Sequence, residues 1–154
     1  MNEEPAIKYA VGFVDGQNLY RHAKDAFGYH HPNYDPIKLH RAVCEVHGWT
    51  PTLVRFYTGT PAFEQSKMWS QYWSNRVLAM KRAGIIVTTR PIRYHRQEVL
   101  LDDGTTQEVT TPQEKGIDVR LALDIVNLTR TKQFTVGVIY SQDQDLSEVA
   151  LEVK

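Results

Sequence analysis

The sequence predicts an α/β fold built on a largely parallel sheet. Short apolar segments rich in β-branched residues alternate along the chain with longer segments whose apolar residues recur at helical spacing. Strands that alternate with helices in this way are typical of a parallel sheet covered by helices. Two of the predicted strands end at acidic turns, and sites in such sheets form beyond the carboxyl ends of the strands.

The first half of the chain has clear start and stop signals. Its first apolar run ends at Asp15-Gly16, as a buried strand closed by a turn does. Further on, Asp35-Pro36 combines an N-cap with proline at the first helical position, and Gly48 ends that helix. The expected elements are a strand over Tyr9–Val14, a helix over Asn18–Phe27, a helix from Pro36 to Gly48, a strand over Thr52–Thr58 and a helix over Ala62–Arg82.

The second half continues the alternation after Gly84, which ends the long helix. Asp103-Gly104 is a hairpin turn dipeptide between two β-rich runs, so a β-hairpin is expected around it. The expected elements are a strand over Ile85–Thr89, a hairpin over Arg93–Thr111, a helix over Gly116–Leu128, a strand over Phe134–Tyr140 and a helix that starts near Asp145.

Composition restricts the class of protein. A chain of 154 residues favours one domain, and 18 basic against 18 acidic residues give zero net charge, which excludes a protein that coats duplexes by phosphate neutralisation. Cys44 is the single cysteine, which excludes internal disulfides and a Cys-rich zinc site. The sequence has neither a membrane-spanning apolar run nor a signal peptide, so we expect a cytoplasmic protein with no membrane partner.

Acidic residues follow two of the predicted strands. Asp15 comes directly after the run that ends at Val14, and Asp143 and Asp145 lie two apart in the turn after Tyr140. Each acid could cap the next helix, but a cap needs one carboxylate and the second turn has two. Because both strands belong to one parallel sheet, the two turns are expected to lie side by side.

A third acidic position lies at the head of the helix predicted over Gly116–Leu128. Taken alone, Asp118 is a first-turn acid that complements the helix dipole. If that helix packs on the sheet, its carboxylate joins the other acids, and carboxylates about 4 Å apart repel by roughly 4 kcal/mol at an effective dielectric of about 20. A hard divalent cation, Mg²⁺ or Mn²⁺, would relieve this repulsion, and such a site suits phosphodiester chemistry.

The ordered set of acidic motifs resembles the NYN domain family, a LabA-like branch of the PIN-like ribonuclease fold. The motifs are Phe13-Val14-Asp15-Gly16-Gln17-Asn18-Leu19, Lys115-Gly116-Ile117-Asp118-Val119 and Ser141-Gln142-Asp143-Gln144-Asp145-Leu146. The resemblance implies a three-layer α/β/α sandwich with a mainly parallel central sheet and a Mg²⁺- or Mn²⁺-dependent nuclease site that acts mainly on RNA. It also assigns the residues: Asp15, Asp118, Asp143 and Asp145 as catalytic and metal-binding acids, and Asn18 as their polar helper.

The chain departs from the family pattern in two places. The last motif usually has glycine after the serine and an aromatic residue after the second aspartate, where this chain has Gln142 and Leu146. Family domains also continue beyond the helix begun at Asp145, whereas the sequence ends at Lys154. We therefore treat residues 1–154 as one NYN/PIN-like domain that stops short at its carboxyl end. A shortened chain, a natural short form and completion by a partner stay open as explanations.

Basic residues crowd the segment after the third predicted strand and could grip the substrate. Positive charge for phosphates and an aromatic ring for base stacking occur together there, which is typical of single-stranded RNA binding. The alternative is a solvated hairpin edge, since charges protect exposed strands. The candidate substrate-binding residues are Arg90, Arg93 and Arg96, with Tyr94 and His95 among them, and Lys115 near Asp118.

Other functions stay open at this stage. A catalytically weak or inactive module that binds RNA or a protein partner would keep the fold, and the short carboxyl end and Gln142 favour it. A phosphatase of the haloacid dehalogenase type also places Asp at the end of its first strand, but it needs a second Asp where this chain has Gln17. DNA stays open as a substrate beside single-stranded RNA. Trp69, Tyr72 and Trp73 are expected to pack the core, with the face of a homodimer as the alternative.

Overall fold

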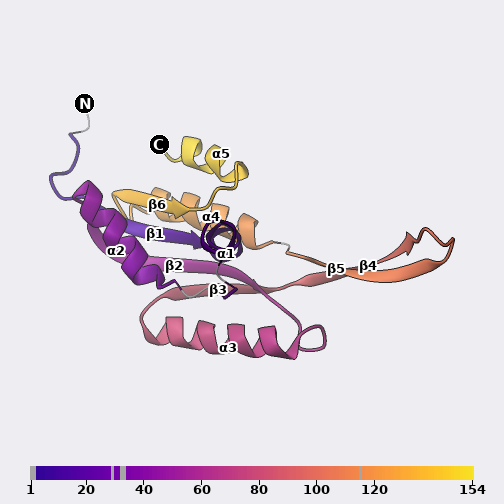
Figure 1. Cartoon of the computed structure of the whole chain (residues 1–154). Coiled ribbons are helices and arrows are strands. Elements are labelled where there is room, and N and C mark those ends of the chain that lie inside the picture. Colours follow the sequence, from indigo (N-terminus) through magenta and orange to yellow (C-terminus); the bar gives the residue numbers. More distant parts are fainter. Residues whose placement is uncertain (1–2, 29, 32–33, 115) are drawn as a thin grey trace.

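The computed structural model describes residues 3–28, 30–31, 34–114 and 116–154. Within these ranges no helix is long and apolar enough to cross a membrane. The elements, shown in Figure 1, are β1 (Tyr9–Asp15), α1 (Gly16–Phe27), α2 (Pro36–His47), β2 (Thr50–Thr60), α3 (Lys67–Arg82), β3 (Ile86–Pro91), β4 (Arg93–Leu100), β5 (Thr106–Gln113), α4 (Ile117–Arg130), β6 (Val136–Tyr140) and α5 (Asp145–Glu152).

The central sheet is parallel, as predicted. Its strand order is β3-β2-β1-β6, and β1 pairs in parallel with both of its neighbours. Asp15 is opposite Tyr57 of β2, and Val14 is opposite Tyr140, the last residue of β6. The carboxyl ends of the strands therefore meet at one edge of the sheet, and Asp15 and the turn after Tyr140 lie next to each other at that edge.

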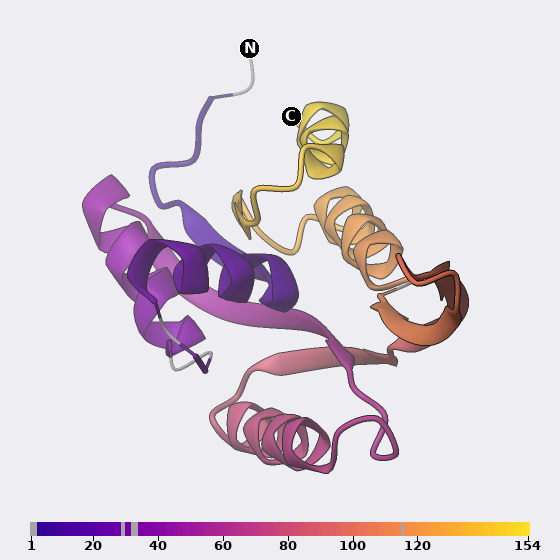
Figure 2. The ribbon, with the colours of Figure 1, turned by 45° about the vertical axis from the view of Figure 1, so that its right-hand side comes forward.

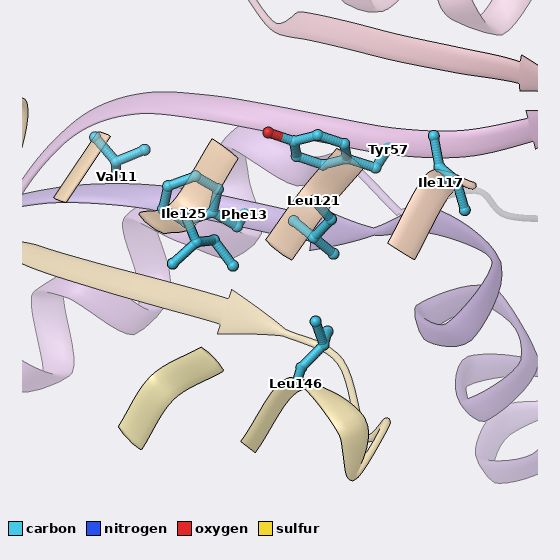
Figure 3. Packing of buried hydrophobic residues seen from close by; sticks show 7 residues of the cluster. All are labelled: Val11, Phe13, Tyr57, Ile117, Leu121, Ile125 and Leu146. Carbon is cyan, nitrogen blue, oxygen red and sulfur yellow. The ribbon is translucent and has the colours of Figure 1, made fainter. Parts of the chain in front are cut away.

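Helices cover both faces of the sheet, which confirms the three-layer sandwich. On one face, Phe13 of β1 packs with Leu121 of α4 and Leu146 of α5, and Figure 3 shows this cluster. On the other face, Val14 packs with Trp73 of α3, and α1 and α2 add further apolar side chains. Neighbouring side chains of β1 point to opposite faces because the side chains of a strand alternate. Figure 2 shows α4 and α5 on one side of the sheet and α1, α2 and α3 on the other.

Local capping and strand pairing move several element boundaries from those predicted. Helix α3 starts at Lys67 rather than Ala62, because Ser66 accepts the N–H of Trp69 as its N-cap and the residues before it form a turn. Strand β2 runs to Thr60, two residues further than predicted, because Thr60 still pairs with Pro91 of β3. Helix α1 starts at Gly16, directly after its cap Asp15, rather than at Asn18.

The predicted hairpin forms a separate two-stranded sheet. Strands β4 and β5 pair antiparallel from Arg93 opposite Gln113 to Leu100 opposite Thr106, and the turn contains Gly104 with φ of 84°. Most of the hairpin is exposed, and Figure 1 shows it projecting from the body of the protein. A two-stranded ribbon is marginally stable alone, so contacts between the base of the hairpin and the body of the protein are needed to fix its position.

A buried histidine joins α2 to the sheet. His40 is 1% exposed, and its Nε2 donates to the carbonyl of Ala10 at 3.0 Å while its Nδ1 lies 2.8 Å from the hydroxyl of Tyr140. The ring lies so close to β1 that a Cβ added at Gly12 would be 2.9 Å from Nδ1. Gly12 is therefore the residue that lets this polar group pack against the strand.

We expect Gly12→Ala to destabilise the fold by roughly 1–3 kcal/mol, because the hydrogen bonds of His40 prevent the ring from moving away. Chemical unfolding of Gly12→Ala, His40→Ala and the double variant measures the effect as a cycle. The penalty of the new methyl group should largely disappear in the His40→Ala background, where the ring is gone. The same penalty in both backgrounds would contradict this contact as the cause.

Candidate active site

The site is centred on Asp15, whose side chain is 9% exposed at the carboxyl end of β1. Its Oδ1 accepts the backbone N–H of Asn18 at 3.3 Å, so it caps α1, and its Oδ2 accepts the hydroxyl of Ser141 at 3.1 Å. Burial raises the pKa of Asp15, and the charges of Asp118 and Asp143 raise it further, against the lowering effect of these two hydrogen bonds. Asp15 therefore both caps α1 and lies close enough to other acids for their charges to act on it.

Hydrogen bonds hold the turn after β6 against the start of α1. The Oδ1 of Asn18 accepts the backbone N–H of Gln142 at 2.8 Å, and Ser141 accepts the N–H of Asp143 at 3.1 Å while donating to Asp15. Asn18, predicted as a polar helper of the acids, uses its carbonyl oxygen to position this turn. Gln142, which stands where the family has glycine, takes part through its backbone N–H.

The structure brings together three of the four predicted aspartates. Asp118 is an exposed residue in the first turn of α4 and Asp143 is half-buried, and the charges of both act on Asp15. Asp145 is the exposed first residue of α5, and its backbone N–H donates to the Oδ1 of Asp143 at 3.0 Å. Its charge is not among those that raise the pKa of Asp15.

Glu114 is a fourth carboxylate at the site that the sequence analysis did not single out. Its side chain is half-buried in the segment between β5 and α4, and a Cβ added at Gly59 would lie 3.1 Å from its Cγ. Burial raises the pKa of Glu114 to about 7, with further contributions from Asp15 and Asp118, while Arg21 lowers it. The only sequence signal was an acid four positions before Asp118.

The negative charges of these carboxylates favour a bound cation, although the side chains do not form a complete set of metal ligands. In the described part of the chain, no three His, Cys, Asp or Glu side chains are grouped closely enough to hold a metal ion. Over the same residues, Asp15, Glu114, Asp118 and Asp143 make none of the ion pairs found. Mg²⁺ keeps several waters and commonly binds through one or two carboxylates, so this donor set fits a hydrated hard cation.

Three of the predicted substrate-binding residues are exposed around the base of the hairpin. Arg90 of β3 is opposite Gly59, which Glu114 contacts, and Arg93 starts β4. Arg96 lies 3.5 Å from Glu108 in an exposed ion pair, which contributes little to stability and leaves its charge accessible. The fourth predicted residue, Lys115, lies outside the described residues.

Asp124 has a structural environment separate from the site. Its carboxylate accepts the hydroxyl of Tyr57 at 2.8 Å and the Nε of Arg120 at 2.9 Å, and Arg55 lies 3.7 Å away. Asp124 is therefore a control position on the same helix as Asp118.

The family model described as NYN domain matches residues 10–154, nearly the whole chain. Among solved structures, a protein of unknown function from Vibrio parahaemolyticus RIMD 2210633, VPA0982, is similar with a TM-score of 0.58 and 16% identity, over 99% of this chain and 76% of that chain. At this identity the likeness concerns the fold alone. No curated protein matches the sequence closely enough to count as a relative.

Proposed function

Because the chain belongs to the NYN domain family, whose members are generally PIN-like nucleases, we propose that it is a metal-dependent ribonuclease that hydrolyses phosphodiester bonds of RNA. The observation that carries this proposal is the meeting of Asp15, Asp118 and Asp143, from three separate segments, at the carboxyl edge of the parallel sheet. Mutually repelling carboxylates are costly to keep unless they serve a cation.

The chain's own residues have separable roles in this proposal. Asp15, Asp118 and Asp143 would hold Mg²⁺ or Mn²⁺, directly or through water, and Asp145 at the rim would hold an outer water. A bound divalent ion lowers the pKa of a water and neutralises charge on the phosphate oxygens. Asn18 keeps the turn of Asp143 in place. Glu114, with its raised pKa, would take the proton of the attacking water, since a general base acts best near the working pH.

Positive charge around the site would hold the phosphates on either side of the cleaved bond. Arg90, Arg93, Arg96 and Lys115 are the proposed contacts, and Arg21 of α1 is a further cation whose charge acts on Glu114. Because the net charge of the chain is zero, this electrostatic attraction of phosphates would be confined to the surface around the site. Single-stranded RNA is the proposed substrate, with DNA of the same sequence as the comparison.

A binding module is the second candidate, because the carboxylates are not grouped as a finished metal cage. Such a module would bind RNA or a protein with this surface and would need no cation. It predicts neither cleavage nor a change of thermal stability when Mg²⁺ or Mn²⁺ is added.

We expect the wild-type protein to cut a labelled single-stranded RNA with Mn²⁺ or Mg²⁺ and to stop cutting with EDTA. Asp118→Asn should slow cutting roughly a hundredfold, because a cation contributes several kcal/mol to the transition state and this acid would hold it. It should also remove the rise in melting temperature that Mn²⁺ causes. Since Asp118 is exposed, the Asp118→Asn variant should fold as wild type does.

Asp124→Asn is the matched control, because it removes a carboxylate from the same helix outside the site. It should cut RNA at close to the wild-type rate when folded protein is compared. Equal cutting by wild type and Asp118→Asn, or no response of either to the cation, would contradict the nuclease proposal and favour the binding module.

A further inference from the structure

An aromatic hollow lies beside the acidic site, between α1, the start of α3 and the base of the hairpin (elements labelled in Figure 1). Its volume is about 390 Å³, within the range of roughly 300–1,000 Å³ common for small-ligand pockets. Among the described residues that line it, none is charged. Its walls include the side chains of Tyr20, Trp69, Trp73, Ile92, Tyr94 and Pro112.

Hydrogen bonds at their polar ends hold the tyrosine rings in place. The hydroxyl of Tyr94 accepts the backbone N–H of Ala62 at 3.0 Å, which ties the hairpin base to the turn before α3. The hydroxyl of Tyr20 donates to the carbonyl of His30 at 2.7 Å. The ring of Trp69 lies 6.5 Å from that of Tyr20, centroid to centroid, at an angle of 54°. The hollow is therefore preformed by rings from three elements.

The hollow shares a wall with the acidic site. Gln17, which lines it, follows Asp15 by two residues, and its Nε2 donates to the Oγ1 of Thr58 at 3.3 Å. The next residue of β2, Gly59, is in contact with Glu114. On the hairpin, Arg96 is two residues from Tyr94 and so shares its face of β4. A strand that crosses the acidic site would thus meet the hollow next.

We propose that this hollow holds one unpaired base of the RNA strand whose phosphate lies at the acidic site. This inference rests on the proposed function, because it uses the same strand. Aromatic rings stack on the face of any base, and an uncharged lining suits a base rather than a phosphate. Because a duplex keeps its bases stacked inside, the hollow would favour single strands. Trp69 packs against the core cluster that contains Trp73, as expected from the sequence, and its half-buried side chain also lines the hollow.

The test measures binding of wild-type protein in EDTA, so that cleavage plays no part. The probes are a short fluorescent single-stranded RNA and copies in which one nucleotide at a time lacks its base. At one position, loss of the base should weaken binding about tenfold, within the range known for stacking on aromatic side chains. Trp69→Ala should weaken binding of the intact RNA by a similar factor and leave binding of that abasic copy unchanged. Trp69→Phe should retain most of the affinity.

Trp49→Ala is the matched control, because it also removes a half-buried tryptophan ring. Trp49 stacks on His47 directly before the start of β2, whereas the acidic site and the hollow lie at the carboxyl end of that strand. It should bind both RNAs as wild type does. Equal losses for intact and abasic RNA in Trp69→Ala would overturn the proposal, because the ring would then act through the fold. No effect of any missing base, or no binding at all, would overturn it too and would favour an apolar peptide as occupant. Cleavage is measured separately, so RNA that is cut without such a base effect would leave the nuclease proposal standing.

Discussion

Asp15→Asn should abolish metal-dependent cleavage of RNA while leaving the protein folded. The expected loss is at least about a hundredfold, because Asp15 is the buried member of the acids that would hold the cation. Asparagine is as good an N-cap as aspartate, so the hydrogen bond to the N–H of Asn18 can persist and α1 should keep its start. The measurement is the cleavage rate with Mn²⁺ at saturating protein, together with the far-ultraviolet circular dichroism spectrum.

The same change should preserve or raise stability in EDTA. The pKa of Asp15 is raised in the folded state, so the folded protein binds this proton more tightly than the unfolded chain does. Its contribution to stability is therefore complete at low pH and is lost as pH rises through the raised pKa. At neutral pH the charged carboxylate costs stability, and asparagine removes that cost.

Asp35→Asn is the control for Asp15→Asn, because Asp35 caps α2 in the same way and is remote from the acidic motifs in the chain. It should cut RNA at the wild-type rate. Unchanged cutting by Asp15→Asn would remove this residue from the site, and equal losses in both variants would assign the effect to capping rather than to chemistry.

The sheet and its acidic edge could be predicted because the signals for them are local. Apolar runs mark the strands, caps such as Asp35 mark the helix starts, and parallel pairing then brings Asp15 and Asp143 to the same edge. Boundaries were less predictable where a cap overrides an apolar pattern. Ser66 starts α3 five residues later than the pattern alone indicates, because its hydroxyl accepts the N–H of Trp69.

The missing parts of the site depend on contacts between distant segments. Glu114 joins it because the hairpin base packs over Gly59, and nothing within a few residues of Glu114 predicts that contact. Asp145 is the exposed first residue of α5, and its backbone N–H donates to the Oδ1 of Asp143, a contact that its spacing from Asp143 does not predict. Trp69 and Trp73, both expected in the core, both contribute to it and both line the hollow, but Trp73 is buried whereas Trp69 is half-buried. The spacing of residues in the sequence does not predict these differences, because each depends on a contact in the folded protein.

Glu114→Gln should slow cleavage roughly a hundredfold, the lower end of the effect of a general base. In wild type, the rate should rise with pH in the range up to about 7, because only the charged form of Glu114 accepts a proton and its pKa without a cation is raised to about 7. A bound cation would move that rise to lower pH. The variant should lack this rise, which a change of fold alone would not produce. The measurement is the cleavage rate with Mg²⁺ across this pH range.

The stability of Glu114→Gln without a cation gives an independent check. Because the pKa of Glu114 is raised from 4.5 to about 7, the wild-type protein should lose stability as pH rises through this interval. The variant should lose less, because only the contribution of Asp15 then remains. At pH 8 the variant should therefore be more stable than wild type by roughly 1–3 kcal/mol, and the difference should vanish at pH 4. Glu45→Gln, on the exposed side of α2, should follow the wild-type curve. A parallel fall of wild type and Glu114→Gln with pH would show that the pKa of Glu114 is not raised in the folded protein, and the rise of the cleavage rate with pH could then not be assigned to this residue.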